Sequence, residues 1–266
     1  MLRFVQILYV FGLYLLFHRD KTAGERLRLG LERLGPVFIK LGQFLATRNF
    51  FAEDVQAELR KLWDGRSALP FDTITRLVER NVGPIDEHFD TFEREALASA
   101  SIAQVHVATY QGRKAAVKIL RPGALEDIRR DIHIARWLIR FGRFVSGKIR
   151  YLDTMGAIRT VESWLIQEVD FRIEAENIGL FRTCYEKVPK MVIPEVWFVS
   201  REVLVMEFLE GIPCNKWREK YRSEGYDPQA SLRTWLVHTF GWAFKRIPVP
   251  IHGDPHPANA IIMTGG

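Results

Sequence analysis

The feature that most constrains this chain is a pair of strand-like segments near its middle, flanked on both sides by long helical patterns. Residues 102–109 and 114–120 are rich in apolar and β-branched side chains, and Gln111-Gly112 lies between them. A short polar and glycine-containing gap between two such runs is typical of a turn that joins two strands. The sequence therefore predicts a strand, a turn and a second strand at this position.

Helical patterns precede these strands. Residues 25–47 have apolar side chains at mostly helical spacing, with one interruption at Gly35-Pro36, and residues 53–64 form a second amphipathic pattern. A third helix is predicted to start at Pro70-Phe71-Asp72, with Asp72 as its N-cap.

More helices follow the strands. Residues 124–147, 153–182 and 229–245 have helical patterns, two short apolar runs span 192–199 and 203–208, and 260–263 reads as a short strand. Helices, then a group of strands, then further helices predict an α+β protein with two lobes. The hydrophobic share of 47% and the charged share of 26% are those of a globular protein.

The charge balance favours anionic partners. The formal net charge is +6 and the sequence pI is about 9.4, which suits phosphate ligands or an anionic membrane surface. No basic run with interleaved aromatic residues is present, so the sequence argues against nucleic-acid binding. Cys184 and Cys214 form neither a metal-binding pattern nor a disulfide framework, which favours a reducing compartment.

The N-terminal segment is almost wholly apolar from Phe4 to Phe17. It is shorter than the roughly 20 residues that a spanning helix needs. Three alternatives stay open: a helix on or in a membrane, a helix packed against the rest of the protein, and a signal peptide. His18, Arg19 and Lys21 would suit lipid headgroups on the cytoplasmic side.

A candidate phosphate-binding loop leads into the first of the two central strands. The kinase pattern G-x-G-x-x-G-x-V is matched here with alanine at every glycine position. Small residues let backbone N–H groups approach phosphates, and alanine permits this if φ stays negative. The alternative is an ordinary turn between strands. The candidate cofactor-binding residues of this segment, here called the alanine loop, are Ala98, Ser99, Ala100, Ser101, Ile102, Ala103 and Val105.

Lys118 follows on the next strand, within Ala115-Ala116-Val117-Lys118. In kinases the lysine of V-A-I-K contacts the α- and β-phosphates, whereas a lone strand lysine is more often a solvated surface residue. Such a lysine needs a carboxylate partner. The helical pattern at 153–182 offers four, and spacing alone does not choose among them: Glu168, Asp170, Glu174 and Glu176.

The local signal that most indicates chemistry lies between His252 and Asn259. His252, Asp254 and Asn259 keep the spacing of the kinase loop H-R-D-x-x-x-x-N, in which the aspartate is the base or hydroxyl-orienting group and the asparagine binds Mg²⁺. Zinc binding by His252 and His256, and a proline-rich loop without chemistry, are the alternatives. Upstream, Glu207-Phe208 marks a strand-to-linker junction of the kind that offers backbone groups to adenine.

Together and in this order, these segments resemble the UbiB/ADCK family of atypical kinase-like proteins, which are associated with ubiquinone biosynthesis. The resemblance covers about residues 24–264. Its signature pieces are Lys40-Leu41-Gly42-Gln43, the alanine loop with its following Gln-Val-His, Glu168-Val169-Asp170, and the His252–Asn259 loop. Jointly these pieces are highly specific.

The resemblance implies a protein-kinase-like two-lobed fold with an N-terminal helical extension, and it implies roles for individual residues. Lys118 would pair with Glu174. Lys40 and Gln43 would fold over the active site, meet Glu168 and Asp170, and occupy the groove where a protein kinase accepts its peptide. The implied domains are an apolar helix at 1–23, the helical extension at 24–90, a kinase-like N-lobe with inserted helices at 91–210, and a partial C-lobe at 211–266.

The resemblance also implies ATP and Mg²⁺ as cofactors, with Asn259 as the metal ligand and Asp254 as the catalytic residue. ATPase or small-molecule chemistry is expected in preference to protein phosphorylation. The implied setting is the cytoplasmic face of a membrane, the bacterial inner membrane, near quinone precursors and other quinone-biosynthesis enzymes.

The sequence departs from the family pattern in three places. Ala258 replaces a common glycine, which is a mild change, and Ala96 replaces a common proline before the alanine loop. The third departure is that the sequence ends at Gly266, before an Asp-Phe-Gly-like segment that would supply a second magnesium ligand. We therefore expect a truncated member with an incomplete C-lobe and impaired magnesium-dependent turnover. A nucleotide-binding scaffold and a small-molecule phosphotransferase remain the alternatives to an ATPase.

Overall fold

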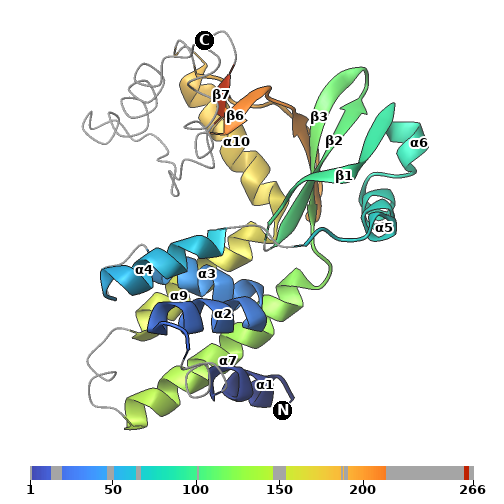
Figure 1. Ribbon diagram of the computed structural model, residues 1–266. Coiled ribbons are helices and arrows are strands. Elements are labelled where there is room, and N and C mark those ends of the chain that lie inside the picture. The colour runs from blue at the N-terminus through green and yellow to red at the C-terminus, as the bar shows by residue number, and fades with distance from the viewer. Residues whose placement is uncertain are drawn as a thin grey trace.

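The computed structural model describes residues 2–12, 20–46, 51–63, 67–100, 102–145, 154–186, 188, 191–213 and 261–263. Within these segments an antiparallel sheet is accompanied by helices, so the predicted α+β class is confirmed (Figure 1). Most of the predicted C-lobe, including the helix expected at 229–245, lies outside the described residues.

The main sheet has five strands in the order β1-β2-β3-β5-β4, and every neighbouring pair is antiparallel. Its strands are β1 (Thr91–Ser99), β2 (Ala103–Tyr110), β3 (Arg113–Leu120), β4 (Val196–Val199) and β5 (Val203–Glu207). The predicted strand pair at the centre is confirmed as β2 and β3. Gln111 and Gly112 between them have φ values of 52° and 74°. Positive φ at both turn residues is the geometry that matches the twist of a two-residue hairpin.

A second, two-stranded sheet pairs β6 (Gly211–Pro213) with β7 (Ile261–Met263), with Ile212 opposite Ile262. This pairing confirms the predicted short strand near the end of the sequence. The pairing also places β6, which follows shortly after β5, next to residues about fifty positions later in the chain.

A group of helices precedes the sheet. It comprises α1 (Leu2–Gly12), α2 (Ala23–Leu34), α3 (Pro36–Ala46), α4 (Glu53–Arg60) and the 3₁₀ turn η2 (Lys61–Trp63). Thr22 and Glu25 form a capping box at the start of α2. The predicted interruption at Gly35-Pro36 is confirmed, since Gly35 has a φ of 99° and separates α2 from α3.

Two further helices, α5 (Phe71–Asn81) and the short α6 (Ile85–His88), precede β1. Ile74 and Val78 of α5 are fully buried against the sheet, in one cluster with Val117 and Val205. The expectation that Asp72 caps α5 is wrong: the N-cap is Pro70, whose φ and ψ are −56° and 139°. Asp72 instead lies in the first turn, where its charge suits the helix dipole.

Three helices are inserted between β3 and β4. They are α7 (Ala124–Val145), α9 (Thr154–Glu168) and α10 (Phe171–Tyr185). The expectation of one helix at 153–182 is wrong, because the chain breaks at Val169-Asp170. Asp170 leaves the helical conformation, and its side chain accepts the backbone N–H of Arg172 as the N-cap of α10. The N–H of Phe171 donates to the carbonyl of Arg201 at 3.1 Å, which holds the break against the sheet.

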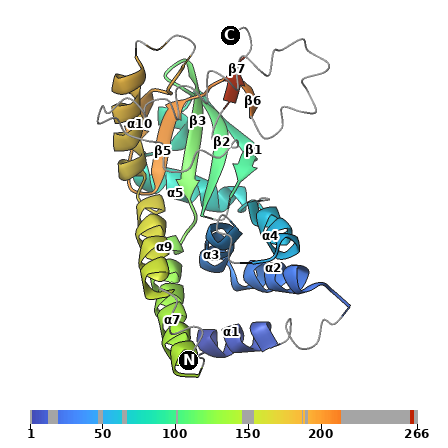
Figure 2. The ribbon, with the colours of Figure 1, turned by 90° about the vertical axis from the view of Figure 1, so that its left-hand side faces the viewer.

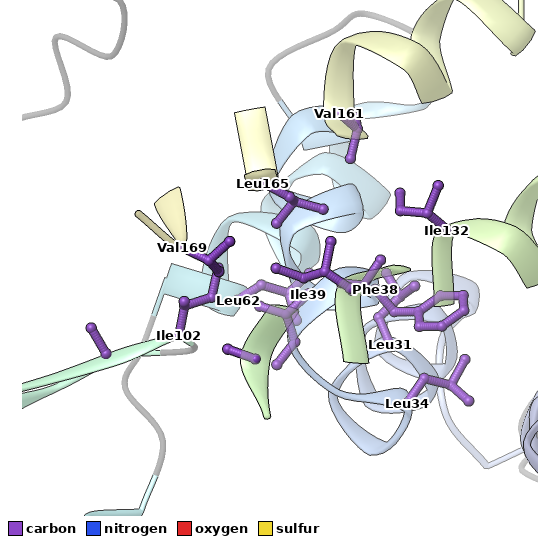
Figure 3. Close-up of a cluster of buried hydrophobic side chains, with 14 of the residues drawn as sticks. Leu31, Leu34, Phe38, Ile39, Leu62, Ile102, Ile132, Val161, Leu165 and Val169 are labelled. Carbon is purple, nitrogen blue, oxygen red and sulfur yellow. The ribbon is translucent and has the colours of Figure 1, made fainter. Parts of the chain in front are cut away.

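The larger hydrophobic core lies among the helices and reaches the sheet. Figure 3 shows buried side chains from α2, α3, η2, α7 and α9 meeting one another. Its labelled members are Leu31, Leu34, Phe38, Ile39, Leu62, Ile102, Ile132, Val161, Leu165 and Val169. Ile102 belongs to the alanine loop, so this core attaches the loop to the helical extension.

The N-terminal helix α1 has a buried and an exposed side. Ile7 and Val10 are 0% and 1% exposed and belong to the helical core, whereas Val5 and Tyr9 are 57% and 62% exposed. In the part of the chain that the structure describes, none of the helices has the length and apolarity needed to cross a bilayer.

Candidate functional site

The centre of the candidate site is an ion pair between Lys118 of β3 and Glu174 of α10. The Lys118 Nζ lies 2.8 Å and 2.6 Å from the two carboxylate oxygens of Glu174, as the family resemblance implied. Their side chains are 27% and 34% exposed, so the pair is partly buried and can still be reached. Figures 1 and 2 show α10 running beside the sheet that carries Lys118.

The break before α10 determines how Glu174 meets Lys118. Because α10 begins at Phe171, Glu174 lies in its first turn. The Lys118 ammonium also lies 5.0 Å from the centre of the Phe171 ring, which is buried. The first turn of a helix is a favourable place for a carboxylate, and the face of an aromatic ring is a favourable neighbour for an ammonium group, so both features stabilise the contact.

The alanine loop lies directly beside this pair. Ala98 and Ser99 end β1, and Ala103 begins β2. The N–H of Ala100 donates to the carbonyl of Ala103 at 2.8 Å, which closes the hairpin. Val105 pairs with Lys118 in the register of β2 and β3, so the loop leads into the strand adjacent to the lysine. Ser101 lies outside the described residues.

The predicted adenine junction lies at the end of β5. Glu207 is the last residue of this strand, and its carboxylate accepts the backbone N–H of Glu195 at 3.1 Å. The N–H of Phe208 donates to the carbonyl of Lys114 at 3.1 Å, and the Lys114 ammonium lies 4.5 Å from the Phe208 ring. The side chain of Glu207 thus supports the sheet, and recognition of a ligand here would fall to backbone groups.

The hydrogen bond that the structure gives Gln43 is not with Glu168 or Asp170, the carboxylates that the resemblance implied for Lys40 and Gln43 together. The Gln43 amide donates instead to the carbonyl of Leu62 at 2.9 Å. Asp170 caps its own helix and pairs with the Arg172 guanidinium at 2.6 Å, and this pairing lowers the pKa of Asp170. The physical reason is that α3 packs on η2, whose last carbonyls need hydrogen-bond donors.

Lys40 and Glu168 are the other two residues that the resemblance implied would meet over the active site. Lys40 lies on α3, and its side chain is outside the described side chains. Glu168 is exposed at the end of α9, the helix against which α3 packs.

Sequence reasoning missed a buried polar chain behind the alanine loop. The backbone N–H of Leu69 donates to Gln104 at 2.7 Å, the Gln104 amide lies 2.8 Å from Nε2 of His106, and Nδ1 of His106 lies 2.8 Å from the carbonyl of Glu93. Gln104 and His106 are 1% and 0% exposed, and burial lowers the pKa of His106. The sequence did contain a signal for this chain of hydrogen bonds: Gln104 and His106 are two residues apart and therefore lie on the same face of an otherwise apolar strand.

The predicted catalytic loop cannot be placed in the site. Asp254 and Asn259 lie outside the described residues. Within the described ranges, His, Cys, Asp and Glu side chains form no group of three or more that could hold a metal ion. The assignments of Asp254 as catalytic residue and Asn259 as magnesium ligand therefore stay predictions.

Comparisons with known proteins agree with this geometry. A family model described as the ABC1 atypical kinase-like domain matches residues 61–266. A probable protein kinase UbiB of Pseudomonas paraeruginosa is 36% identical over 250 residues, covering 92% of this chain and 46% of the relative. The probable protein kinase UbiB of Pasteurella multocida is 35% identical over 270 residues, covering 92% and 49%. The chain thus spans about half the length of the curated relatives it matches.

A solved structure is also similar. It is described as the complex of Rv3197 with erythromycin from Mycobacterium tuberculosis. The two proteins are 30% identical with a TM-score of 0.57, and the match covers 85% of this chain and 56% of that one. The ordered motifs, the Lys118–Glu174 pair beside the alanine loop and these matches lead to one conclusion. The chain belongs to the ABC1 atypical kinase-like family and is homologous to the UbiB probable protein kinases.

Proposed function

We propose that this chain binds ATP between the alanine loop, Lys118 and the end of β5. The observation that carries the proposal is the ion pair of Lys118 with Glu174, one strand away from the alanine loop. In kinase-type sites such a lysine contacts the α- and β-phosphates, and its glutamate partner holds it in place.

The described residues fit a nucleotide in two respects. An ammonium group has three N–H donors; Lys118 directs donors to both oxygens of Glu174 and is still partly exposed to an incoming phosphate. Alanine in a phosphate loop also requires negative φ. Among the described non-glycine residues only Gln111 has a positive φ, so Ala98, Ala100 and Ala103 meet this requirement.

We further propose ATPase or small-molecule chemistry that supports quinone-lipid synthesis at the cytoplasmic face of a bacterial membrane. When bound, ATP supplies the phosphoryl group. Lys118 would hold its phosphates, Asp254 would orient the accepting hydroxyl or water, and Asn259 would hold Mg²⁺. The family match supports this proposal, as do the net charge of +6 and the exposed Val5 and Tyr9 on α1.

A magnesium-dependent ATP-binding measurement on the 266-residue chain tests the proposal. Lys118→Ala removes the phosphate-binding charge and should weaken binding by about 10- to 100-fold, because hydrogen bonds to charged groups contribute roughly 1.5–3 kcal/mol each. Lys61→Ala is the matched control, since Lys61 pairs with Glu58 on the helical extension. Its affinity should equal that of the wild type.

Three outcomes distinguish the possibilities. Equal and negligible binding by the wild type and Lys118→Ala would remove the nucleotide proposal for this chain. Tight binding together with hydrolysis that Asp254→Asn abolishes would support an ATPase, whereas binding without hydrolysis would favour a nucleotide-gated scaffold.

A further inference from the structure

One arginine reaches both the alanine loop and the part of the helical extension that directly precedes α5. Arg121 follows β3 directly, and its Nε donates to the carbonyl of Ala100 at 3.0 Å. Its terminal NH2 group donates to the Ser99 hydroxyl at 2.7 Å and to the carbonyl of Ser67 at 2.8 Å. Its backbone N–H donates to the carbonyl of Ile102 at 2.8 Å.

A second connection joins the same two parts of the chain. Residues 67–70, here called the connecting segment, belong to the helical extension and directly precede α5. Within it, the N–H of Leu69 donates to Gln104, which lies on β2 between Ala103 and Val105 of the alanine loop. Arg121 and Gln104 therefore hold the connecting segment to the loop at two points, two residues apart.

The orientation of the Gln104 amide is determined by its neighbours. Its oxygen must face the Leu69 N–H, so its NH₂ group faces Nε2 of His106. That nitrogen must accept, and Nδ1 then carries the proton donated to the carbonyl of Glu93. Turning the amide would set two donors against each other at Leu69, which a buried group tolerates poorly.

We propose that Arg121 and Gln104 are positioning residues that tie the alanine loop to the connecting segment and thereby hold the loop in the conformation that accepts phosphates. This inference rests on the proposed ATP site, because it takes the alanine loop to be its phosphate loop. It adds that the helical extension, through residues 67–70, determines the geometry of that loop.

The physical reason lies in the loop carbonyls. Arg121 binds the carbonyl of Ala100 with its side chain and that of Ile102 with its backbone. A peptide flip that presented either oxygen to a phosphate would have to break one of these bonds. Holding both carbonyls in the free protein reduces the ordering that a ligand must impose, which strengthens binding without a direct contact.

The test is MgATP affinity in the 266-residue chain. Arg121→Gln cannot reach three acceptors and should weaken MgATP binding about tenfold, as expected for losing a charged hydrogen-bond cluster that preorganises a site. Arg121→Lys should fail to restore it, because an ammonium lacks the planar fork that serves separate acceptors. The control is Arg113→Gln at the opposite end of β3, where Arg113 pairs with Glu195; it should bind MgATP like the wild type.

Amide hydrogen exchange of the nucleotide-free protein provides a readout that general loss of stability would not reproduce. In Arg121→Gln, exchange should accelerate in residues 98–104 and 67–70, while the core of α2 and α3 and the urea midpoint stay unchanged. Should Arg121→Gln fold poorly, Ser99→Ala removes one acceptor and should show the same exchange pattern with about two- to threefold weaker binding.

Three results would separate the alternatives. Wild-type affinity and exchange in Arg121→Gln would overturn the positioning role. Full rescue by Arg121→Lys would overturn it as well, because it would indicate a direct contact of the charge with phosphate. Absence of MgATP binding by the wild type would instead overturn the proposed function. The hydrogen-exchange pattern would then decide whether Arg121 holds the alanine loop to the connecting segment.

Discussion

Gly42, in the Lys-x-Gly-Gln motif, makes a specific prediction about packing. It is a buried helical residue of α3, and a Cβ added there would lie 2.4 Å from Cδ1 of Leu62 and 2.7 Å from Cδ1 of Leu31. Real Cβ atoms do not approach other carbon atoms so closely. Both leucines are 3% exposed or less, so they have little room to move. Gly42→Ala should therefore overpack the contact of α3 with α2 and η2.

The magnitude follows from two opposing terms. Replacing glycine by alanine inside a helix stabilises by about 1 kcal/mol through backbone entropy and helix propensity. Inserting a methyl group into a packed core costs about 1–3 kcal/mol. We therefore expect Gly42→Ala to lower the free energy of unfolding by about 1 kcal/mol, within a range of roughly 0–2.

A second helical glycine provides the matched control. Gly179 of α10 is exposed, and an added Cβ would meet nothing within 4 Å. Gly179→Ala has the same gain in propensity without the collision, so it should raise the free energy of unfolding by about 1 kcal/mol. Urea denaturation of the two variants and the wild type measures both changes, and their opposite signs are the result to look for.

The reasoning would be refuted if Gly42→Ala stabilised the protein as much as Gly179→Ala. That result would mean that Leu62 and Leu31 can rearrange at no cost, and that close packing is not why glycine stands in the motif. Lys-x-Gly-Gln would then need an explanation outside the contact between α3 and η2.

Two further predictions concern titratable groups. Burial lowers the pKa of His106 below its ordinary value of 6.5, so the unfolded chain binds more protons. The contribution of neutral His106 to the free energy of unfolding should be fully present above pH 6.5 and should be lost as the pH falls below it. His106→Gln should therefore make the free energy of unfolding less dependent on pH between about pH 7.5 and 5.5. An equal pH dependence in the variant and the wild type would contradict this. Asp170→Ala should cost about 1 kcal/mol in urea denaturation through loss of the α10 N-cap, whereas Asp170→Asn should retain most of the capping energy. Because Arg172 lowers the pKa of Asp170, the stability that depends on this charge should be present above its ordinary pKa of 3.8 and lost as the pH falls below it. Equal stability of the alanine and asparagine variants would contradict the capping role.

Local patterns predicted the elements that depend on local physics. The β2–β3 hairpin needs positive φ at Gln111 and Gly112, and a turn at this pair was predicted. Gly35 ended a helix where the pattern was interrupted. The same kind of reasoning failed at Asp170, because an aspartate inside an apolar helical pattern does not reveal whether it faces solvent or ends the helix. In the structure the break coincides with a long-range hydrogen bond, from the backbone N–H of Phe171 to the carbonyl of Arg201 thirty residues later.

The partner of Lys118 likewise could not be identified from local sequence patterns. Spacing offered four carboxylates, and only the family resemblance singled out Glu174 among them. The structure brings Glu174 to Lys118 because α10 starts at Phe171 and lies beside the sheet. For Lys40 and Gln43 the resemblance implied contacts with Glu168 and Asp170, whereas in the structure the carbonyl of Leu62 accepts the hydrogen bond of Gln43.

By itself, then, the sequence determined the hairpin, most of the helical segments and the order of the alanine loop and Lys118 along the chain, because turn conformation and side-chain periodicity act over a few residues. Tertiary structure decided which carboxylate holds the lysine, that Gly42 is needed for close packing, and that Arg121 joins Ser67 to Ser99. Those contacts join residues tens of positions apart. They exist only once strand pairing and helix packing have brought distant segments together.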